Sequence, residues 1–205
     1  MDEDKMKPKL LVVGDSFMKS DPAFPGQHWS EMLPEYEILM YSVSGCSNGI
    51  IANQFFQGLK NQPDAVVLGF TEPNRIEFDY QGGYITNSHG SATFDQALTV
   101  DLYKIHTSYR MQMIKACSMA KGLLLSLERR KIPYAWTLNL LFNDLATLPY
   151  PSDPSVQEIL GDCMHRMIPT NLATYQGFKM TPGFHTDDPE WQSCFAQEVR
   201  EILQK

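Results

Sequence analysis

Short apolar runs recur through the first third of the chain, and each ends at a glycine or a polar residue. Residues 10–13, 37–43 and 65–68 form three such runs. Runs of this length without polar alternation are typical of strands covered on both faces, as in a parallel sheet. The stretches 28–33 and 50–59 between them favour helices. The first part of the chain therefore predicts the order strand, helix, strand, helix, strand.

A longer helical pattern follows a loop at 81–91 that is rich in Gly, Ser and Asn, and it extends from about residue 95 to residue 130. Apolar residues recur in it at spacings of three and four, which predicts one apolar face that covers the sheet. These residues are Met113, Cys117, Ala120, Leu124 and Leu127.

The remaining elements follow Pro133. Residues 134–138 are a fourth strand candidate, and 155–164 and 189–203 are later helices. Asp188 predicts the start of the last helix, because an aspartate cap accepts from the first amides and Pro189 suits the first turn. Strands alternating with helices predict one domain over residues 1–205, an α/β fold in three layers. Its site is expected beyond the carboxyl ends of the strands.

Composition excludes several function classes. A net charge of −7 is unfavourable for nucleic-acid binding, and the four cysteines form no C-x-x-C pair typical of zinc or redox sites. The charged N-terminus does not resemble a signal peptide, and no apolar run approaches the length that spans a membrane. We therefore expect no nucleic-acid partner, no membrane span and no metal. A cytoplasmic location is expected, and the sequence is also compatible with a viral protein carried into a particle.

Gly14, Asp15 and Ser16 follow the first strand directly. A serine at a strand-to-helix turn exposes its hydroxyl above the sheet and directs its own amide towards an incoming oxyanion, which suits a nucleophile. The competing interpretation is a plain helix cap, for which Asp15 and Ser16 would both serve.

In this arrangement the sequence resembles the GDSL/SGNH hydrolase family, whose first block is a strand followed by Gly-Asp-Ser. The resemblance implies a mostly parallel, flavodoxin-like sheet. It also implies that Gly45, after the second strand, is an oxyanion donor. The third block, normally Gly-x-Asn-Asp, is replaced by a stretch in which Thr71 occupies the asparagine position. Asn74 is the alternative donor if the loop bends at Pro73, and direct spacing favours Thr71.

The last family block is Asp-x-x-His near the C-terminus. The resemblance implies that His185 is the general base, but Pro182 stands where the aspartate is expected. A backbone carbonyl from 181–183 could orient the imidazole in a Ser-His dyad, because the acid sets tautomer and orientation rather than transferring the proton. Asp187 is the alternative orienting acid of a triad, although helix capping competes for it.

Other residues match parts of catalytic motifs. Ser47 lies in Gly-x-Ser-x-Gly, the nucleophile elbow of larger sheets, and ranks below Ser16 because only two strands precede it. His28 is interpreted as a packing or helix-start residue. The three remaining histidines carry no catalytic or metal-binding pattern; they are His89, His106 and His165.

The resemblance thus implies a cofactor-independent serine hydrolase acting on a small carboxylic ester, for example an O-acetyl group on a carbohydrate. Asp15 and Arg75 are candidate substrate contacts, and Arg75 with Glu77 could instead form a structural pair. The departures in the third and last blocks are similar to divergent phage-encoded members, and they leave open a binding module of the same fold without efficient catalysis. A nucleotide-binding domain is disfavoured, because the sequence lacks both G-x-G-x-x-G and the phosphate-binding Gly-Lys-Ser/Thr signature. The sequence leaves the oligomeric state open.

Overall fold

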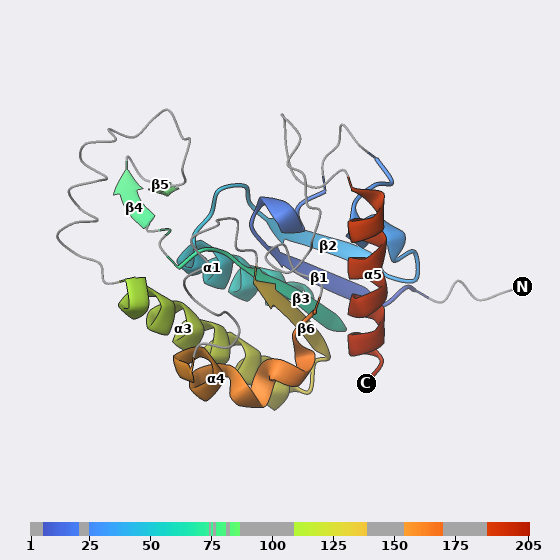
Figure 1. Cartoon of the computed structure of the whole chain (residues 1–205). Coiled ribbons are helices and arrows are strands. Elements are labelled where there is room, and N and C mark those ends of the chain that lie inside the picture. Colours follow the sequence, from blue (N-terminus) through green and yellow to red (C-terminus); the bar gives the residue numbers. More distant parts are fainter. Residues whose placement is uncertain are drawn as a thin grey trace, which may run out of the picture.

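A computed structural model describes residues 6–20, 25–73, 75, 77–80, 83–86, 109–138, 154–169 and 188–205. Four strands form a parallel sheet in the order β2-β1-β3-β6 (Figure 1). Their bounds are β1 Lys9–Gly14, β2 Glu37–Ser42, β3 Ala65–Phe70 and β6 Tyr134–Leu138. A separate antiparallel pair follows β3 and consists of β4 Glu77–Tyr80 and β5 Gly83–Thr86.

Helices lie on both faces of the sheet. The α-helices are α1 Asn48–Gly58, α3 Tyr109–Arg130, α4 Pro154–Leu160 and α5 Pro189–Leu203. The 3₁₀ helices are η1 Ser16–Met18, η2 Trp29–Met32, η3 Leu59–Asn61 and η5 Gly161–Arg166. None of the helices described has the length and apolarity needed to cross a membrane.

The core is divided by the sheet into two apolar layers. Leu11 and Val13 of β1 pack in a layer with residues of α1, α3 and α4, whereas Leu10 and Val12 pack with residues of η2 and α5. Successive side chains of a strand point to opposite faces, so one continuous apolar run supplies both layers. This arrangement confirms the three-layer α/β prediction.

The strand predictions are confirmed: β6 has the predicted ends, and the ends of the other three strands differ by at most two residues. The five residues of the predicted apolar helix face are all buried on α3. The predicted helix at 28–33 is the short 3₁₀ helix η2, and residues 95–108 of the predicted long helix lie outside the described part. Asp188 caps α5 by accepting hydrogen bonds from the amides of Glu190 and Trp191.

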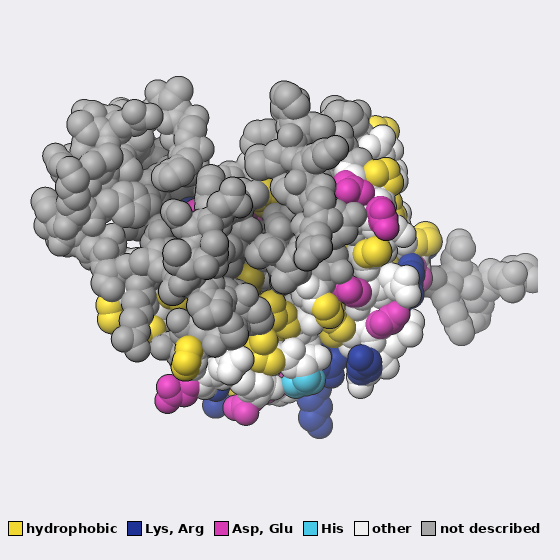
Figure 2. Space-filling view, in the orientation of Figure 1, with side chains coloured by type: hydrophobic (Ala, Val, Ile, Leu, Met, Phe, Trp, Pro, Cys, Tyr) yellow, Lys and Arg dark blue, Asp and Glu magenta, His cyan; other side chains and the backbone are white. Residues whose placement is uncertain are grey.

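The outer face of α5 is polar, as expected for a helix that covers one side of a sheet. Its buried side chains include Trp191, Phe195 and Val199. Figure 2 shows Asp and Glu side chains over α5, and Lys and Arg side chains at the lower edge of the same face. The helix therefore contributes one apolar stripe to the core.

The strand register brings three loops together. Gly14 at the end of β1 is opposite Ser42 of β2, and Val13 is opposite Leu68 of β3. Because the strands are parallel, the loops that leave β1, β2 and β3 begin at the same edge of the sheet. These loops carry the residues that the sequence singles out.

The backbone at Gly14 has no room for a side chain. A Cβ atom there would meet the side chain of Met18 and would lie 2.8 Å from the carbonyl oxygen of Gly69. We expect Gly14→Ala to lower the free energy of unfolding by roughly 1–3 kcal/mol, because backbone atoms must shift to admit the methyl group. Urea unfolding followed by circular dichroism measures this change.

Gly122 on α3 is a matched control, because nothing lies within 4 Å of a Cβ atom built there. Gly122→Ala should raise the free energy of unfolding by up to about 1 kcal/mol through helix propensity. Equal effects of the two substitutions would contradict the packing assigned to Gly14.

Candidate functional site

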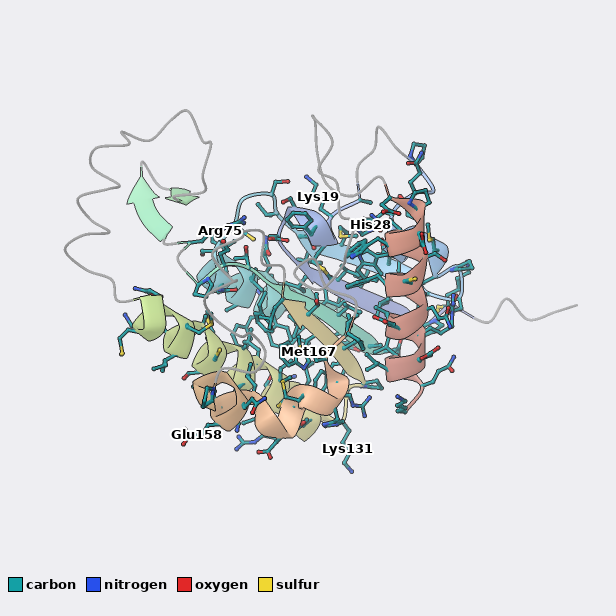
Figure 3. The ribbon with its side chains drawn as sticks, in the orientation of Figure 1. Lys19, His28, Arg75, Lys131, Glu158 and Met167 are labelled. Carbon is teal, nitrogen blue, oxygen red and sulfur yellow. The ribbon has the colours of Figure 1, made fainter. Side chains whose placement is uncertain are left out.

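The candidate site lies at the carboxyl edge of the sheet, where the β1, β2 and β3 loops meet. In Figure 3 Lys19, His28 and Arg75 lie at this end of the molecule, and Lys131 lies at the opposite end. Ser16, Gly45 and Thr71 stand on the three loops in turn. The structure thus places the candidate nucleophile and two of the candidate oxyanion donors on neighbouring loops.

Ser16 is the first residue of η1, the turn that follows β1. Asp15 caps this turn and accepts a hydrogen bond from the Phe17 amide at 3.0 Å. Ser16 is 5% exposed, and neither its amide nor its hydroxyl has a hydrogen-bond partner among the described residues. Neither group is therefore held by a contact within the described part. The capping role, which the sequence left open between the two residues, belongs to Asp15.

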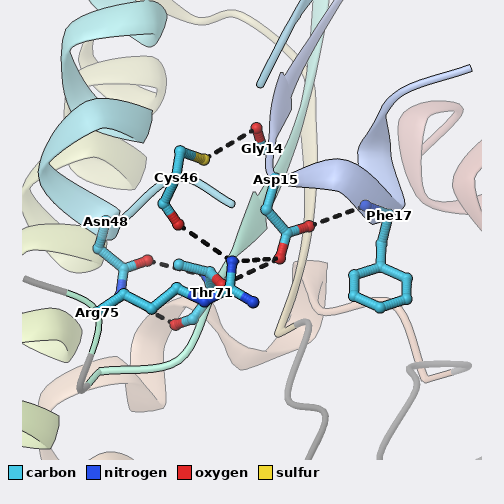
Figure 4. Close-up of polar contacts among 7 residues, drawn as sticks. All are labelled: Gly14, Asp15, Phe17, Cys46, Asn48, Thr71 and Arg75. Carbon is cyan, nitrogen blue, oxygen red and sulfur yellow. Dashed lines mark hydrogen bonds and ion pairs between the residues drawn. The ribbon is translucent and has the colours of Figure 1, made fainter. Parts of the chain in front are cut away.

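The carboxylate of Asp15 is the centre of a buried polar network (Figure 4). Its side chain has no exposed surface. Besides the Phe17 amide, it accepts a hydrogen bond from the Thr71 hydroxyl at 2.9 Å and lies 3.6 Å from Nη1 of Arg75. Three groups from two loops thus converge on one buried anion, which satisfies its need for hydrogen bonds and a countercharge.

Arg75 is itself anchored inside the protein. Its side chain is 9% exposed, and Nη1 donates to the carbonyl oxygen of Cys46 at 3.2 Å. Its backbone amide donates to the Glu72 carbonyl oxygen at 3.1 Å. Arg75 thus forms a structural ion pair with Asp15. The predicted pair with Glu77 is not tested, because the Glu77 side chain lies outside the described part.

Asn48 clamps the loop after β3 to the start of α1. Its side-chain nitrogen donates to the Thr71 carbonyl oxygen, and its side-chain oxygen accepts from the Thr71 amide, both at 2.9 Å. The Thr71 hydroxyl has one hydrogen, which is donated to Asp15. In this arrangement both donor groups of Thr71 are already engaged.

The loop after β2 combines a left-handed backbone conformation at Gly45 with a buried thiol at Cys46. Gly45 has φ of +71°, a conformation that glycine adopts at little cost. The Cys46 thiol donates to the Gly14 carbonyl oxygen at 3.4 Å. Burial raises the pKa of Cys46 to about 12, and the negative charge of Asp15 adds to this effect. The thiol is therefore protonated at neutral pH and is a poor nucleophile.

Ser47, the alternative nucleophile, is fully buried and caps α1. Its hydroxyl oxygen accepts from the Ile50 amide at 3.3 Å. A cap of this kind satisfies one of the free amides in the first turn of a helix. The position of Ser47 after only two strands, β1 and β2, is as the sequence predicted.

His28 is confirmed as a helix-start residue. It caps η2, its Nδ1 lies 2.7 Å from the Ser30 hydroxyl, and its Nε2 lies 3.4 Å from the Phe17 carbonyl oxygen. His165 lies in η5, with Nδ1 2.9 Å from the Asp162 carbonyl oxygen. The described residues contain no group of three or more His, Cys, Asp or Glu able to hold a metal ion.

No family model and no curated protein sequence matches the chain. Solved structures do. An esterase, EstA from Pseudoalteromonas sp., aligns over 97% of both chains at 12% identity with a TM-score of 0.57. A putative lipolytic protein of the G-D-S-L family from Desulfitobacterium hafniense aligns over 96% of this chain and 99% of its own at 11% identity, also with 0.57. TesA aligns over 96% and 98% at 15% identity with 0.53.

The chain has the SGNH hydrolase fold. These alignments cover nearly all of it, which confirms the fold implied by the Gly-Asp-Ser, Gly45 and His185 blocks. Within the SGNH fold the structure brings together Asp15, Ser16 and the three loops. The other candidates, Asn74, His185 and Asp187, lie outside the described residues, as do His89 and His106.

Two site residues, Asn48 and Cys46, received no functional role from the sequence. Their contacts join positions 23 and 32 residues apart in the chain. Only the polar pair formed by Ser47 and Asn48 at the helix start could have drawn attention to this position.

The buried His28 makes stability depend on pH. Burial lowers its pKa to about 4, while the Phe17 carbonyl opposes this shift. The unfolded chain, with a pKa near 6.5, therefore binds the proton first, and stability falls as the pH drops from about 6.5 towards 4. Between pH 7 and pH 5 we expect this residue to cost about 2 kcal/mol of unfolding free energy.

His28→Asn keeps a capping side chain and removes the titrating ring. Urea unfolding of both proteins at pH 7 and pH 5 measures the difference in pH dependence. A variant that loses as much stability as the wild type over this range would contradict the assignment.

Proposed function

We propose that the chain is a serine hydrolase that cleaves carboxylic esters, with Ser16 as the nucleophile and His185 as the general base. The observation that carries this proposal is the position of Ser16 in the first turn after β1. Its amide and hydroxyl have no partner in the described part, while Asp15 and Phe17 on either side are fixed by hydrogen bonds. The fold, shared with proteins whose names include an esterase and a lipolytic protein, supports this chemistry.

In the proposed reaction His185 takes the proton of the Ser16 hydroxyl as the serine oxygen attacks the ester carbonyl carbon. The amides of Ser16 and Gly45 donate to the oxyanion of the tetrahedral intermediate. His185 then returns the proton to the leaving alcohol, and an acyl-enzyme remains. Water deacylates it by the same route. Each step needs only side chains and backbone amides, so the mechanism requires no cofactor.

The start of α5 supports the assignment of His185. The Trp29 amide of η2 donates to Oε1 of Gln192 at 2.7 Å, and His28 at the start of η2 contacts the Phe17 carbonyl oxygen. The start of α5 therefore packs on the helix that contacts η1. His185 precedes Asp188 by three residues, so chain geometry keeps their Cα atoms within about 11 Å.

A third oxyanion donor is proposed from a side chain. Thr71 can serve only if it releases Asp15, because its one hydroxyl hydrogen is donated there. Asn74 is therefore the better side-chain candidate, a reversal of the preference that spacing alone gives. A small acyl ester, such as an O-acetylated carbohydrate, is the substrate class we propose. A binding module of the same fold is the alternative, and the engaged Thr71 is the observation that favours it.

Substitution of the two serines tests the nucleophile. Ser16→Ala should lower the kcat for p-nitrophenyl acetate by at least about a thousandfold, because the covalent step is lost. Ser47→Ala should leave turnover unchanged and lower the free energy of unfolding by about 1 kcal/mol, because it removes a helix cap and keeps the proposed nucleophile. Steady-state kinetics and urea unfolding measure the two effects.

If only Ser47→Ala loses turnover, Ser47 rather than Ser16 is the nucleophile. Turnover that depends on neither serine would favour the binding module.

A pair of neighbouring aspartates tests the orienting group of His185. Asp188 is committed to capping α5, and Asn is an equally good cap, so Asp188→Asn should keep its activity. If Asp187 orients His185, Asp187→Asn should lower kcat by about two orders of magnitude or more, because the imidazole loses its preferred tautomer. The kcat of both variants is measured with p-nitrophenyl acetate. Full activity in Asp187→Asn would leave a Ser-His dyad oriented by a backbone carbonyl.

A further inference from the structure

The buried network around Asp15 has a role that neither the fold nor the family resemblance assigns. Thr71 stands where the family places an oxyanion asparagine, and Arg75 was considered a substrate contact. In the structure both side chains bind Asp15, and Arg75 also binds the Cys46 carbonyl oxygen. Their observed contacts are with the protein itself.

The geometry points to Thr71 and Arg75 as positioning residues that act on Ser16 through the carboxylate of Asp15. This inference rests on the proposed role of Ser16 as the nucleophile. Ser16 lies between two anchored neighbours, because the Asp15 carboxylate also holds the amide of Phe17. The orientation of that carboxylate therefore sets the turn that directs the hydroxyl and amide of Ser16.

The two carboxylate oxygens of Asp15 bind different partners. Oδ1 accepts from the Phe17 amide, and Oδ2 accepts from Thr71 and faces Arg75. Rotation of the carboxylate away from Phe17 would break the contacts of Oδ2 with the β3 loop. Thr71 and Arg75 thereby hold the carboxylate in the one orientation that caps η1.

Arg75 also supplies the countercharge that a fully buried carboxylate requires. Loss of this guanidinium would remove a countercharge from a buried anion, which is costly. Arg75 is in turn held by the Cys46 carbonyl oxygen, next to Gly45. One guanidinium therefore ties the loop of the nucleophile to the loop of the proposed oxyanion donor.

The positioning role predicts a characteristic kinetic pattern. Thr71→Val and Arg75→Met should each lower kcat for p-nitrophenyl acetate by about tenfold or more, with KM within about twofold, because a small displacement of the nucleophile slows the chemical step. Thr71→Ser keeps the hydroxyl and should stay within about threefold of the wild type in kcat. Arg75→Lys keeps the charge and should fall between Arg75→Met and the wild type.

The double variant separates this role from the alternatives. If both residues act through Asp15, the double variant Thr71→Val with Arg75→Met should have a kcat within about twofold of that of the slower single variant. Losses that multiply would overturn the inference, because Thr71 would then contribute independently, as an oxyanion donor does. A raised KM with unchanged kcat in Arg75→Met would overturn it in favour of a substrate contact.

Arg200→Met is the matched control for the loss of an arginine–carboxylate pair. Arg200 binds Glu35 at 2.6 Å on the surface, and we expect its replacement to leave kcat and KM unchanged. All assays are run below the unfolding midpoint of each variant, measured by circular dichroism. Should Arg75→Met or Thr71→Val fail to fold, Arg75→Lys still tests the inference, since wild-type kcat in that variant would overturn it.

Failure of this inference is distinguishable from failure of the proposed function. Wild-type kinetics in Thr71→Val and Arg75→Met, together with inactivity of Ser16→Ala, would overturn the positioning role alone. Wild-type turnover in Ser16→Ala would overturn the proposed function and this inference with it.

Discussion

A single buried carboxylate ties together the loops on which the candidate site depends. Asp15 has no exposed side-chain surface, and both the turn that follows β1 and the loop that follows β3 supply partners to it. Removing one partner from a buried ion pair typically costs about 3–5 kcal/mol, because the remaining charge stays in a medium of low polarity. The loops therefore have little freedom to separate while the carboxylate stays charged. Arg75 extends this constraint to the loop after β2.

The sheet makes this network possible. The order β2-β1-β3-β6 places β1 between β2 and β3, so the loops of all three strands begin side by side. Apolar layers on both faces fix the strands, and the start of α5 contacts η2 on the side of the sheet opposite α1. The same packing that buries Leu10 and Leu11 thus determines where Ser16 stands. The packing of the two apolar layers on the sheet therefore underlies both the stability of the fold and the geometry of the site.

The sequence predicted the parts of this structure that depend on local pattern. The four strands are short apolar runs, and the start of α5 is marked by Asp188 and Pro189, so periodicity and capping chemistry were sufficient. The site itself was predicted only in outline. Asp15 meets Thr71 across 56 positions, and Asn48 meets it across 23. Such contacts depend on which strands become neighbours and on the paths of their loops, which local sequence patterns do not show.

The central claim is that Ser16 is a nucleophile held in place by its neighbours. The most direct measurement is reaction of the protein with a fluorophosphonate, followed by peptide mass spectrometry that locates the adduct. We predict one phosphonyl group per chain, attached to Ser16. Protein that is denatured before the reagent is added should carry none. An adduct on Ser47 or Cys46, or no adduct in the folded protein, would contradict the account.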